Sequence, residues 1–341
     1  SVPVPSDIWV DSVAGNNNND GLSATNAFRT VQKAADVAGP GTTVHILPGR
    51  YRESVKPVRS GTALNPIRYI AEAGPGTATI LGSEPSSSLT WVKLTSNSIG
   101  LPSGVDPTQI YYADLSPWGL DSAPRFVVER NSTGGVSARL PQAREPDWDV
   151  ITEWKYHEFW WAADGGSDVA GCDPSENSDP NCDLPWRSLT QLTDRTNDSQ
   201  PSGVEQGSLA TLGNLTGATL VAMDSLQGHY AYRRSIVVHN VAAGRITVST
   251  DCAYDGNFGK PALGWGSKYY VEGLPGLLDK QGEWWYDSSS KRLYLWPPSP
   301  GNPGSQDLEI SRRGSGFDLS HRSHITLDSL ALELFEESAV Y

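Results

Sequence analysis

Short runs that alternate apolar and polar positions dominate the chain, and Gly or Pro bounds many of them. They are rich in β-branched residues, and alternation with a period of two between turn residues is typical of half-buried β-strands. The runs cover 43–54, 65–76, 77–84, 244–250, 306–311 and 323–334. The pattern therefore predicts many short strands and little helix.

One segment near the start has a helical period instead. Its apolar positions, which fall on one face of a helix, are Phe28, Val31, Ala34, Ala35 and Ala38. Thr25 or Asn26 can cap the start of this helix, and Gly39 its end. Because only one side is apolar, we expect the helix to lie across the open end of the strand-rich part and to shield it from water.

Two β-hairpins are predicted in the middle of the chain. GEWWYD and KRLYLW lie on either side of the turn Ser288–Ser290, and SIVVHNVAAGRITVST turns at Ala243–Gly244. We assign both to a Trp-rich β subdomain over 85–305, inserted between 1–84 and 306–341.

The run 323–334 has the pattern of one coil of a stacked β-solenoid. Its inward positions are expected to be Ile325, Leu327, Leu330, Leu332 and Leu334. A terminal coil needs a cap, so we expect the coils of 306–341 to continue beyond Tyr341 or to self-associate through the exposed C-terminal coil.

Several segments carry a family resemblance. GNNNNDGLSATNAFRTVQKAA, HILPGRYRESV and NPIRYIAEAGPGTATILG, within 8–84, resemble the N-terminal cap and first coils of pectate-lyase-like right-handed parallel β-helix proteins. SKYYVEGLPGLLDKQGEWWYDSSSKRLYLWPP, over 267–298, is similar to a segment that precedes the main helix in large β-helix glycoside hydrolases. The resemblance implies an all-β, right-handed parallel β-helix with an N-terminal capping helix and an inserted β subdomain. It also implies hydrolase activity, with catalytic groups on later coils.

The charge balance narrows the partners. Asp and Glu number 39 against 26 Lys and Arg, which gives a formal charge of −13. Nucleic acid and anionic membrane surfaces are repelled by such a chain, whereas a neutral or weakly charged polysaccharide is not. No apolar run approaches the roughly 20 residues that span a bilayer. Ser1 follows no apolar leader, which predicts the mature form of a secreted protein.

Export predicts covalent modifications. Cys172 and Cys182 share one polar loop and are expected to form a disulfide, which leaves Cys252 as a buried thiol. Glycosylation sequons begin at Asn131, Asn197 and Asn214, and would be used in a eukaryotic secretory pathway.

Aromatic residues offer a candidate substrate-binding surface. Six of the twelve Trp residues fall between Trp148 and Trp265, and sugar rings stack on such side chains. Trp148, Trp160 and Trp161 are the candidates for a glycan platform. The alternative is that the Trp residues form the core of the inserted subdomain.

Carboxylates are the candidate catalytic groups. A glycosidase needs two carboxyls beside the scissile bond. The sequence offers Glu145 and Asp147 in AREPDWD, and Glu333 and Glu336 near the end, although neighbouring acids are also common on solvated surfaces. A polysaccharide lyase would need a base and a cation, which GHYAYRR (228–234) could supply unless it is an ordinary strand.

Calcium is the one cofactor with a pointer in the sequence. Asp173, Asp179 and Asp183 crowd the loop that holds the two cysteines, although an acidic solvated loop has the same composition. We therefore expect either no cofactor or calcium.

The sequence as a whole predicts a secreted carbohydrate-active protein, a glycoside hydrolase that acts on an extracellular polysaccharide. Two alternatives remain open at this point. One is a non-catalytic protein that binds glycans or forms filaments at a surface, and the other is a polysaccharide lyase.

Overall fold

The computed structural model describes residues 4–147, 161–163, 187–194, 209–223, 231–252, 263–264 and 267–341, and most of its regular structure is β-strand. The chain forms two compact units. Unit 1 consists of Ser1–Thr90, Asp114–Arg139 and Pro303–Tyr341, and unit 2 consists of Trp91–Ala113 and Leu140–Asn302. The boundaries predicted for the inserted subdomain, at 84/85 and 305/306, are not tested by this division and stay predictions.

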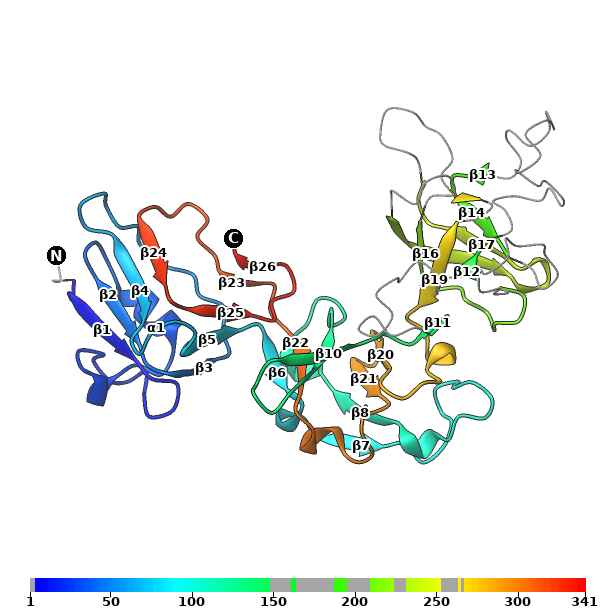
Figure 1. The fold of residues 1–341 in the computed structure, drawn as a ribbon, viewed down its shortest axis with the longest axis horizontal. Helices are drawn as coiled ribbons and strands as arrows, with labels where there is room; N and C mark the ends of the chain where they lie inside the picture. The colour runs from blue at the N-terminus through cyan, green and yellow to red at the C-terminus, as the bar shows by residue number, and fades with distance from the viewer. Residues whose placement is uncertain are drawn as a thin grey trace. The chain divides into compact units, whose positions relative to one another are not determined.

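Unit 1 holds a four-stranded parallel sheet in the order β1-β2-β4-β24 (Figure 1). Its strands are β1 (Asp7–Val10), β2 (Thr43–Ile46), β4 (Ile67–Ala71) and β24 (Ile325–Asp328). The register aligns Ile8 with Val44 and Val44 with Tyr69, and all three side chains are buried. The period-two pattern of the sequence therefore places one apolar row on the inner face of this sheet.

Two smaller parallel sheets complete the parallel part of unit 1. One has the order β25-β5-β3, and the other pairs β23 with β26. Their bounds are β3 Gly49–Tyr51, β5 Ala78–Leu81, β23 Ser315–Phe317, β25 Ala331–Glu333 and β26 Ser338–Val340. Ile325, Leu327, Leu330 and Leu332 pack, partly buried, against the core of unit 1, as the alternation predicts. Leu334, the fifth predicted inward position, is not among the residues packed there, and its φ of 58° interrupts the extended backbone.

The predicted helix forms as α1 (Val31–Val37) and buries Val31, Ala34 and Ala35. Its predicted N-cap is wrong. Thr30 caps it, because the Thr30 side chain accepts a hydrogen bond from the Lys33 backbone N–H. Thr25 and Asn26 lie instead in a short 3₁₀ turn, and Phe28 is extended in a β-bridge with Val10, so the helix cannot begin earlier.

The remaining sheet of unit 1 has the order β10-β9-β22-β6, and β22 runs antiparallel to both β9 and β6. Its strands are β6 Ser83–Pro85, β9 Val127–Arg130, β10 Val136–Leu140 and β22 Leu308–Ser311. The 3₁₀ turns of the chain are η1 Ala24–Asn26, η2 Ser86–Ser88, η3 Pro107–Gln109, η4 Ser116–Trp118, η6 Val241–Ala243, η7 Pro275–Leu277 and η8 Pro303–Ser305.

The strand pairs of unit 2 whose direction is described are antiparallel, and one isolated bridge, Gln142 with Trp284, is parallel. Its largest sheet has the order β11-β19-β15-β16-β17-β14, and β12 also pairs with β19. These strands are β11 Arg144–Glu145, β12 Trp161–Ala162, β14 Gln191–Thr193, β15 Thr219–Met223, β16 Ala231–Asn240, β17 Arg245–Val248 and β19 Lys268–Glu272. Two further sheets use β7 Trp91–Lys93, β8 Tyr111–Asp114, β20 Trp284–Asp287 and β21 Arg292–Leu295, and β13 Arg187–Ser188 with β18 Leu263–Gly264.

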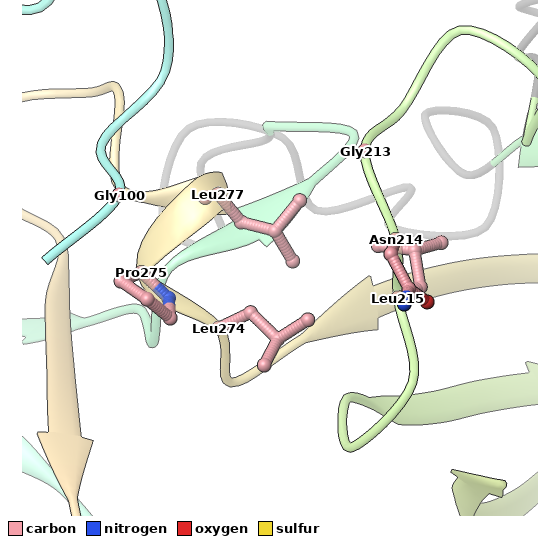
Figure 2. A pocket seen from close by; sticks show the side chains of 8 residues that line it. Gly100, Gly213, Asn214, Leu215, Leu274, Pro275 and Leu277 are labelled. Atoms are coloured by element: carbon pink, nitrogen blue, oxygen red, sulfur yellow. The ribbon is translucent and has the colours of Figure 1, made fainter.

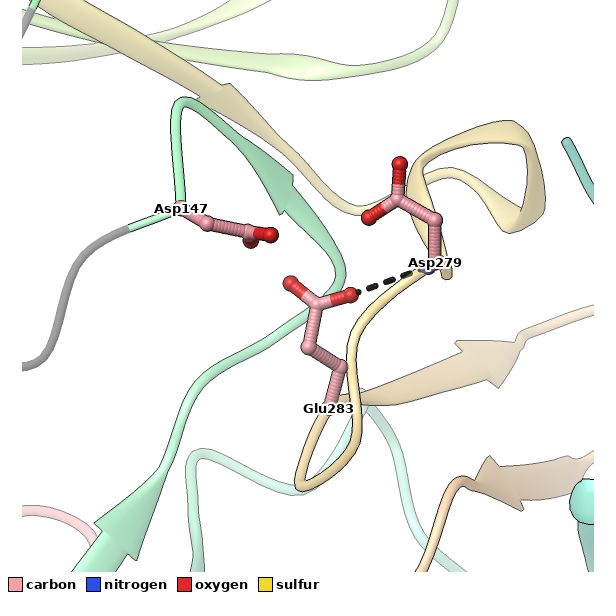
Figure 3. Close-up of side chains that lie close together, drawn as sticks. All are labelled: Asp147, Asp279 and Glu283. Carbon is pink, nitrogen blue, oxygen red and sulfur yellow. Dashed lines mark hydrogen bonds between the residues drawn. The ribbon is translucent and has the colours of Figure 1, made fainter. Parts of the chain in front are cut away.

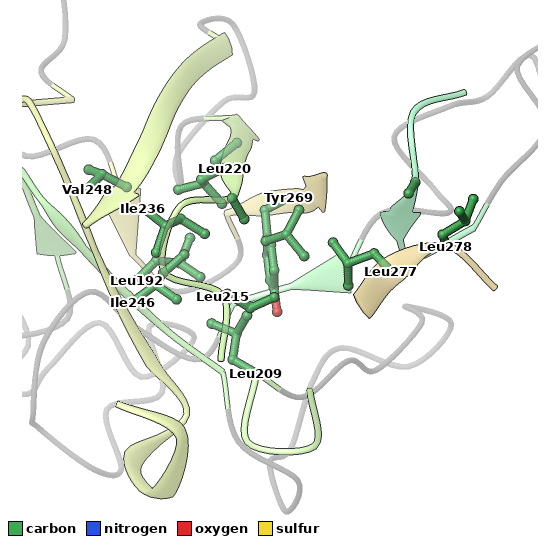
Figure 4. Close-up of a cluster of buried hydrophobic side chains, with 14 of the residues drawn as sticks. Leu192, Leu209, Leu215, Leu220, Ile236, Ile246, Val248, Tyr269, Leu277 and Leu278 are labelled. Carbon is green, nitrogen blue, oxygen red and sulfur yellow. The ribbon is translucent and has the colours of Figure 1, made fainter. Parts of the chain in front are cut away.

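Both predicted hairpins are confirmed. β20 and β21 pair with Trp285 opposite Tyr294, and β16 and β17 pair across η6. Gly244 ends that turn at a φ of 56°, a left-handed conformation that glycine adopts without strain. Figure 4 shows the apolar core beneath these strands, in which Leu192, Leu220, Ile236, Ile246 and Tyr269 are buried.

The prediction of a right-handed parallel β-helix is wrong for this chain. The described sheets are mixed: three sheets of unit 1 are parallel, while its fourth sheet and the largest sheet of unit 2 contain antiparallel pairs. Alternating strands with Gly and Pro at their ends fit either direction of pairing, because the pattern fixes which side chains are buried and not which strand lies beside which. The all-β class stands. Within the described ranges no helix is long and apolar enough to cross a bilayer.

One carboxylate ties together the three chain segments of unit 1. Glu309 on β22 is fully buried, and both of its oxygens accept hydrogen bonds from Arg52, at 2.7 and 2.8 Å. Ser83 Oγ donates to it at 2.8 Å and Arg130 Nε at 3.3 Å. Burial acts to raise the pKa of Glu309, but these hydrogen bonds and the arginine charges outweigh it and lower the pKa.

We predict that Glu309→Gln lowers the free energy of unfolding by about 3 kcal/mol or more, because Arg130 would keep a buried charge with no carboxylate inside the core. Glu333→Gln is the matched control. Glu333 also contacts Arg130, at 3.2 Å, but 43% of its side chain is exposed, so its loss should cost less than about 1 kcal/mol. Urea unfolding measures both, and equal losses would contradict the role of Glu309.

On the outer face of the parallel sheet, His45 on β2 lies between two carboxylates. Its Nε2 is 3.0 Å from Asp7 Oδ1, its Nδ1 is 2.6 Å from Glu72 Oε2, and Trp9 stacks on the ring at 4.4 Å. Burial acts to lower the pKa of His45, but the two carboxylates raise it above 6.5 overall. Only the imidazolium form can donate to both carboxylates at once.

We predict that His45 stabilises unit 1 at acidic and neutral pH and loses this effect in base. Its pKa is higher in the folded chain, so the stabilisation is complete below the unfolded value of about 6.5 and disappears as the pH rises through the folded value. The difference in unfolding free energy between wild type and His45→Gln should therefore shrink from pH 6 to pH 9 in urea unfolding. The control is Asp328→Asn, which removes an acid paired with Arg68. The difference in unfolding free energy between wild type and Asp328→Asn should stay constant from pH 6 to pH 9.

Candidate functional site

Three carboxyl groups converge in unit 2. Oxygen atoms of Asp147, Asp279 and Glu283 all lie within 4.8 Å of one another, and Figure 3 shows the three side chains pointing toward a common space. Asp147 follows β11, while Asp279 and Glu283 lie between η7 and β20. Asp147 and Asp279 are half-buried and Glu283 is fully buried.

Backbone hydrogen bonds fix the segment that leads to Asp147. Residues 141–145 lie between β19 and β20, since Ala143 N–H donates to Trp284 O at 2.8 Å and Gly273 N–H donates to Ala143 O at 2.9 Å. Arg144 also pairs with Glu272 on β19. The turn that carries Asp279 connects β19 to β20, and the strand that leads to Asp147 bonds to residues at both of these strands.

Glu283 joins these two parts of the backbone directly. Its Oε1 accepts a hydrogen bond from the Arg144 N–H at 3.1 Å, and its Oε2 accepts from the Asp279 and Lys280 N–H groups, both at 3.2 Å. Trp284, the next residue, is also buried and donates from its indole to Leu140 O at 2.9 Å. The sequence Glu-Trp at the start of β20 thus anchors both sides of the site.

The carboxyls perturb one another. Burial, then the charge of Asp147 and a hydrogen bond with it, raises the pKa of Glu283 to about 10. Burial and then the charge of Asp147 raise the pKa of Asp279 to about 6. Burial also raises the pKa of Asp147, although the hydrogen bond from Glu283 works against that rise. At neutral pH Glu283 is therefore the group that keeps a proton and shares it with Asp147.

A buried cation lies beside these acids. Arg144 is only 6% exposed, and its guanidinium lies over the Tyr270 ring at 5.7 Å. Burial lowers the pKa of Arg144, while Tyr270 and the acids Glu272 and Glu283 act to raise it. Arg233 pairs with Glu272 in turn. The site is therefore a network of several acids around one buried arginine.

The arrangement suits proton transfer. Two half-buried carboxyls with different surroundings face each other, and Asp279 Oδ1 is buried with no hydrogen-bond partner among the described residues. Carboxylate oxygens also attract hard cations such as calcium. Both oxygens of Glu283 already accept backbone N–H groups, which leaves this side chain poorly suited to a cation.

A separate apolar pocket of about 290 Å³ lies in the same unit (Figure 2). Its lining consists of Gly100, Gly213, Asn214, Leu215, Leu274, Pro275, Gly276 and Leu277. The lining holds no acid or base, so we place no reaction there. Asn214, a predicted glycosylation site, is exposed at the rim, and its Oδ1 accepts from the Thr216 N–H at 3.0 Å.

The predicted catalytic residues separate into two groups. Asp147 belongs to the carboxyl cluster, and Glu145 lies beside it and hydrogen-bonds Asp279. Glu333 and Glu336 belong to unit 1. Glu336 accepts hydrogen bonds there from Ser311 Oγ at 2.7 Å and from the Arg125 N–H at 3.2 Å, while Glu333 contacts Arg130.

Several other predictions lie outside the described residues. These are the platform residues Trp148 and Trp160, the disulfide Cys172–Cys182, the calcium candidates Asp173, Asp179 and Asp183, and the sequon at Asn197. Trp161 is described only through its backbone, which pairs with Tyr269. The sequon residue Asn131 is exposed, and its Oδ1 accepts from Thr133 Oγ at 2.7 Å.

The buried thiol predicted at Cys252 is confirmed, and burial raises its pKa to about 11. Asp279 and Glu283 were not among the predicted site residues. A signal for them exists in LLDKQGEWW, where two acids stand between apolar residues that are buried, Leu278 and Trp284. An acid that stands beside large apolar residues is a candidate for burial.

No protein-family profile matches the chain, and no curated protein matches it either. A solved structure described as "Glycoside hydrolase" is similar with a TM-score of 0.58 and 14% sequence identity, over 96% of this chain and 50% of that chain. A second, "The complex structure of XylC with xylose", has a TM-score of 0.40 and 14% identity, over 94% of this chain and 34% of that chain.

The first of these likenesses concerns the fold, and the chain spans half the length of the protein it matches. The second is too distant to carry an argument. The resemblance of 8–84 to pectate-lyase-like proteins and that of 267–298 to large β-helix glycoside hydrolases are tested by neither structure and stay predictions.

We predict that Asp147→Asn lowers the pKa of Asp279 from about 6 toward its ordinary 3.8, because the substitution removes the neighbouring negative charge. Carbon-13 NMR titration of the Asp279 carboxyl measures this change. Asp287→Asn is the control, since Asp287 hydrogen-bonds Ser289 and Ser290 in a turn and should leave Asp279 unchanged. An unchanged Asp279 titration in Asp147→Asn would show that the two carboxyls do not interact.

Proposed function

We propose that this chain belongs to a secreted carbohydrate-active protein that hydrolyses glycosidic bonds of an extracellular polysaccharide, with Asp147 and Asp279 as the reacting carboxyls. The observation that carries the proposal is the convergence of these two half-buried acids on one space in unit 2. The fold shared with a solved glycoside hydrolase supports the class of reaction. The formal charge of −13 favours a neutral glycan over a polyanionic one.

The two acids can divide the chemistry between them. Asp279, with a pKa of about 6, is the general acid that gives its proton to the glycosidic oxygen as that bond breaks. Asp147 is the carboxylate that attacks the anomeric carbon and forms a glycosyl ester. Asp279 then removes a proton from water, which hydrolyses the ester and restores both carboxyls.

The spacing of the acids indicates the stereochemical course. Their nearest oxygens lie no more than 4.8 Å apart, which is below the roughly 6.5 to 9.5 Å of inverting enzymes, so the shorter separation of retaining enzymes, roughly 5 Å, fits better. We therefore expect hydrolysis with retention of the anomeric configuration, which proton NMR of the first-formed product distinguishes from inversion.

We predict that Asp147→Asn and Asp279→Asn each lower kcat by about 10²- to 10⁴-fold. The first removes the proposed nucleophile and the second the proposed general acid, so each affects the bond-breaking step. New reducing ends, measured on a panel of neutral polysaccharides, give the rate. Asp106→Asn is the matched control in the same unit, since Asp106 is exposed and hydrogen-bonds Thr108 and Gln109 of its own turn. Wild-type rates in both site variants would exclude these carboxyls.

The same assay separates the alternatives. Ultraviolet absorbance from unsaturated uronates would indicate a lyase, although Arg233 of the candidate lyase segment is paired with Glu272 and His229 and Tyr230 lie outside the described residues. Binding of a glycan without any bond cleavage would indicate a non-catalytic protein.

A further inference from the structure

We propose that Glu283 is a positioning residue of this site, a carboxylic acid that sets the distance between Asp147 and Asp279 by binding the backbone N–H groups of Arg144 and Asp279 and by donating a hydrogen bond to Asp147. This inference rests on the proposed function for its catalytic consequence. Its structural part, which concerns the proton and the spacing, stands on contacts within unit 2 alone.

The first step of the argument is the reach of one side chain. Glu283 accepts the Arg144 N–H, three residues before Asp147, and also the N–H of Asp279 itself. These two backbone positions are 135 residues apart in the sequence (279 minus 144). A fully buried carboxyl that bonds both leaves neither segment free to shift without losing a hydrogen bond in a place that water does not reach.

The second step concerns the proton. Glu283 has no exposed surface, and its neighbour Asp147 is also acidic, so two negative charges side by side would be costly. A neutral Glu283 removes that repulsion, and its O–H can donate to Asp147 and hold that carboxylate in one orientation. Three backbone N–H groups remain on its oxygens. This geometry needs no cation to satisfy Glu283.

Two variants test the proposal. Glu283→Gln keeps the shape and offers an N–H to Asp147 and an oxygen to the backbone, but its NH₂ group cannot accept the N–H groups on that side. We expect kcat to fall by about tenfold or less, with the pH dependence of Asp279 retained. Glu283→Leu removes both functions and should lower kcat by about 100-fold or more with a smaller change in KM, because the reacting groups lose their alignment.

A readout independent of activity keeps the proposal testable if Glu283→Leu does not fold. In the wild-type chain, the carbon-13 signal of the Glu283 carboxyl should not titrate between pH 4 and 8, and Glu283→Gln should leave the Asp147 carboxyl signal near its wild-type position. Titration of Glu283 near pH 4.5 would overturn the inference. Calcium that shifts the Glu283 signal at micromolar concentration would overturn it as well, because the group would then be an ionised ligand.

Failure of the proposed function produces a different pattern. One outcome is that the wild type cleaves no glycan, Glu283 keeps its proton, and the Asp147 carboxyl signal shifts in Glu283→Leu but not in Glu283→Gln. The hydrolase proposal then fails and the positioning role is supported. If the wild type is active and Glu283→Leu matches it in kcat and pH profile, the positioning role fails and the hydrolase proposal stands.

Discussion

A single buried carboxylate is the constraint on which unit 1 depends. Glu309 has no exposed surface, yet it binds residues from all three chain segments of the unit: Arg52 and Ser83 from the first, Arg130 from the second, and its own strand from the third. A carboxylate removed from water must be fully paired, and here two guanidinium groups and a hydroxyl supply the pairing. These contacts therefore favour the arrangement in which the three segments meet at this point, where the antiparallel sheet that holds Glu309 lies beside Arg52 of the parallel part.

The local parts of this fold could be predicted from the sequence. The hairpin of β20 and β21 follows from three serines between two runs of apolar residues, and the apolar face of α1 follows from its spacing. The start of α1 did not follow, because Phe28 pairs with Val10 in a β-bridge that a helical pattern does not reveal. The direction of pairing did not follow either. β22 lies antiparallel to β6, a strand more than 220 residues earlier, and no feature within either strand specifies that partner.

The candidate site divides in the same way. Asp147 and Glu145 could be proposed from the sequence because acids are concentrated around them. Asp279 and Glu283 are isolated acids in the segment that precedes the predicted hairpin of β20 and β21. Their role in the site depends on β11, because Glu283 accepts a hydrogen bond from the Arg144 N–H there. Carboxyls gain unusual proton affinity only when folding brings them together away from water, so the interaction that defines this site does not exist at the level of the sequence.

The segment order of unit 1 has a consequence for how the chain folds. Most of unit 2 comes from one stretch, Leu140–Asn302, whose hairpins are formed by neighbours in the sequence. Unit 1 must instead join Arg52 to Glu309 across 257 positions, and closing so long a loop carries an entropic cost before any contact compensates for it. During synthesis the strands of Pro303–Tyr341 follow all of unit 2, so the first segment lacks β22, β24 and β25 until then. We therefore expect unit 1 to assemble more slowly than unit 2, with the edge of its parallel sheet unpaired in the meantime.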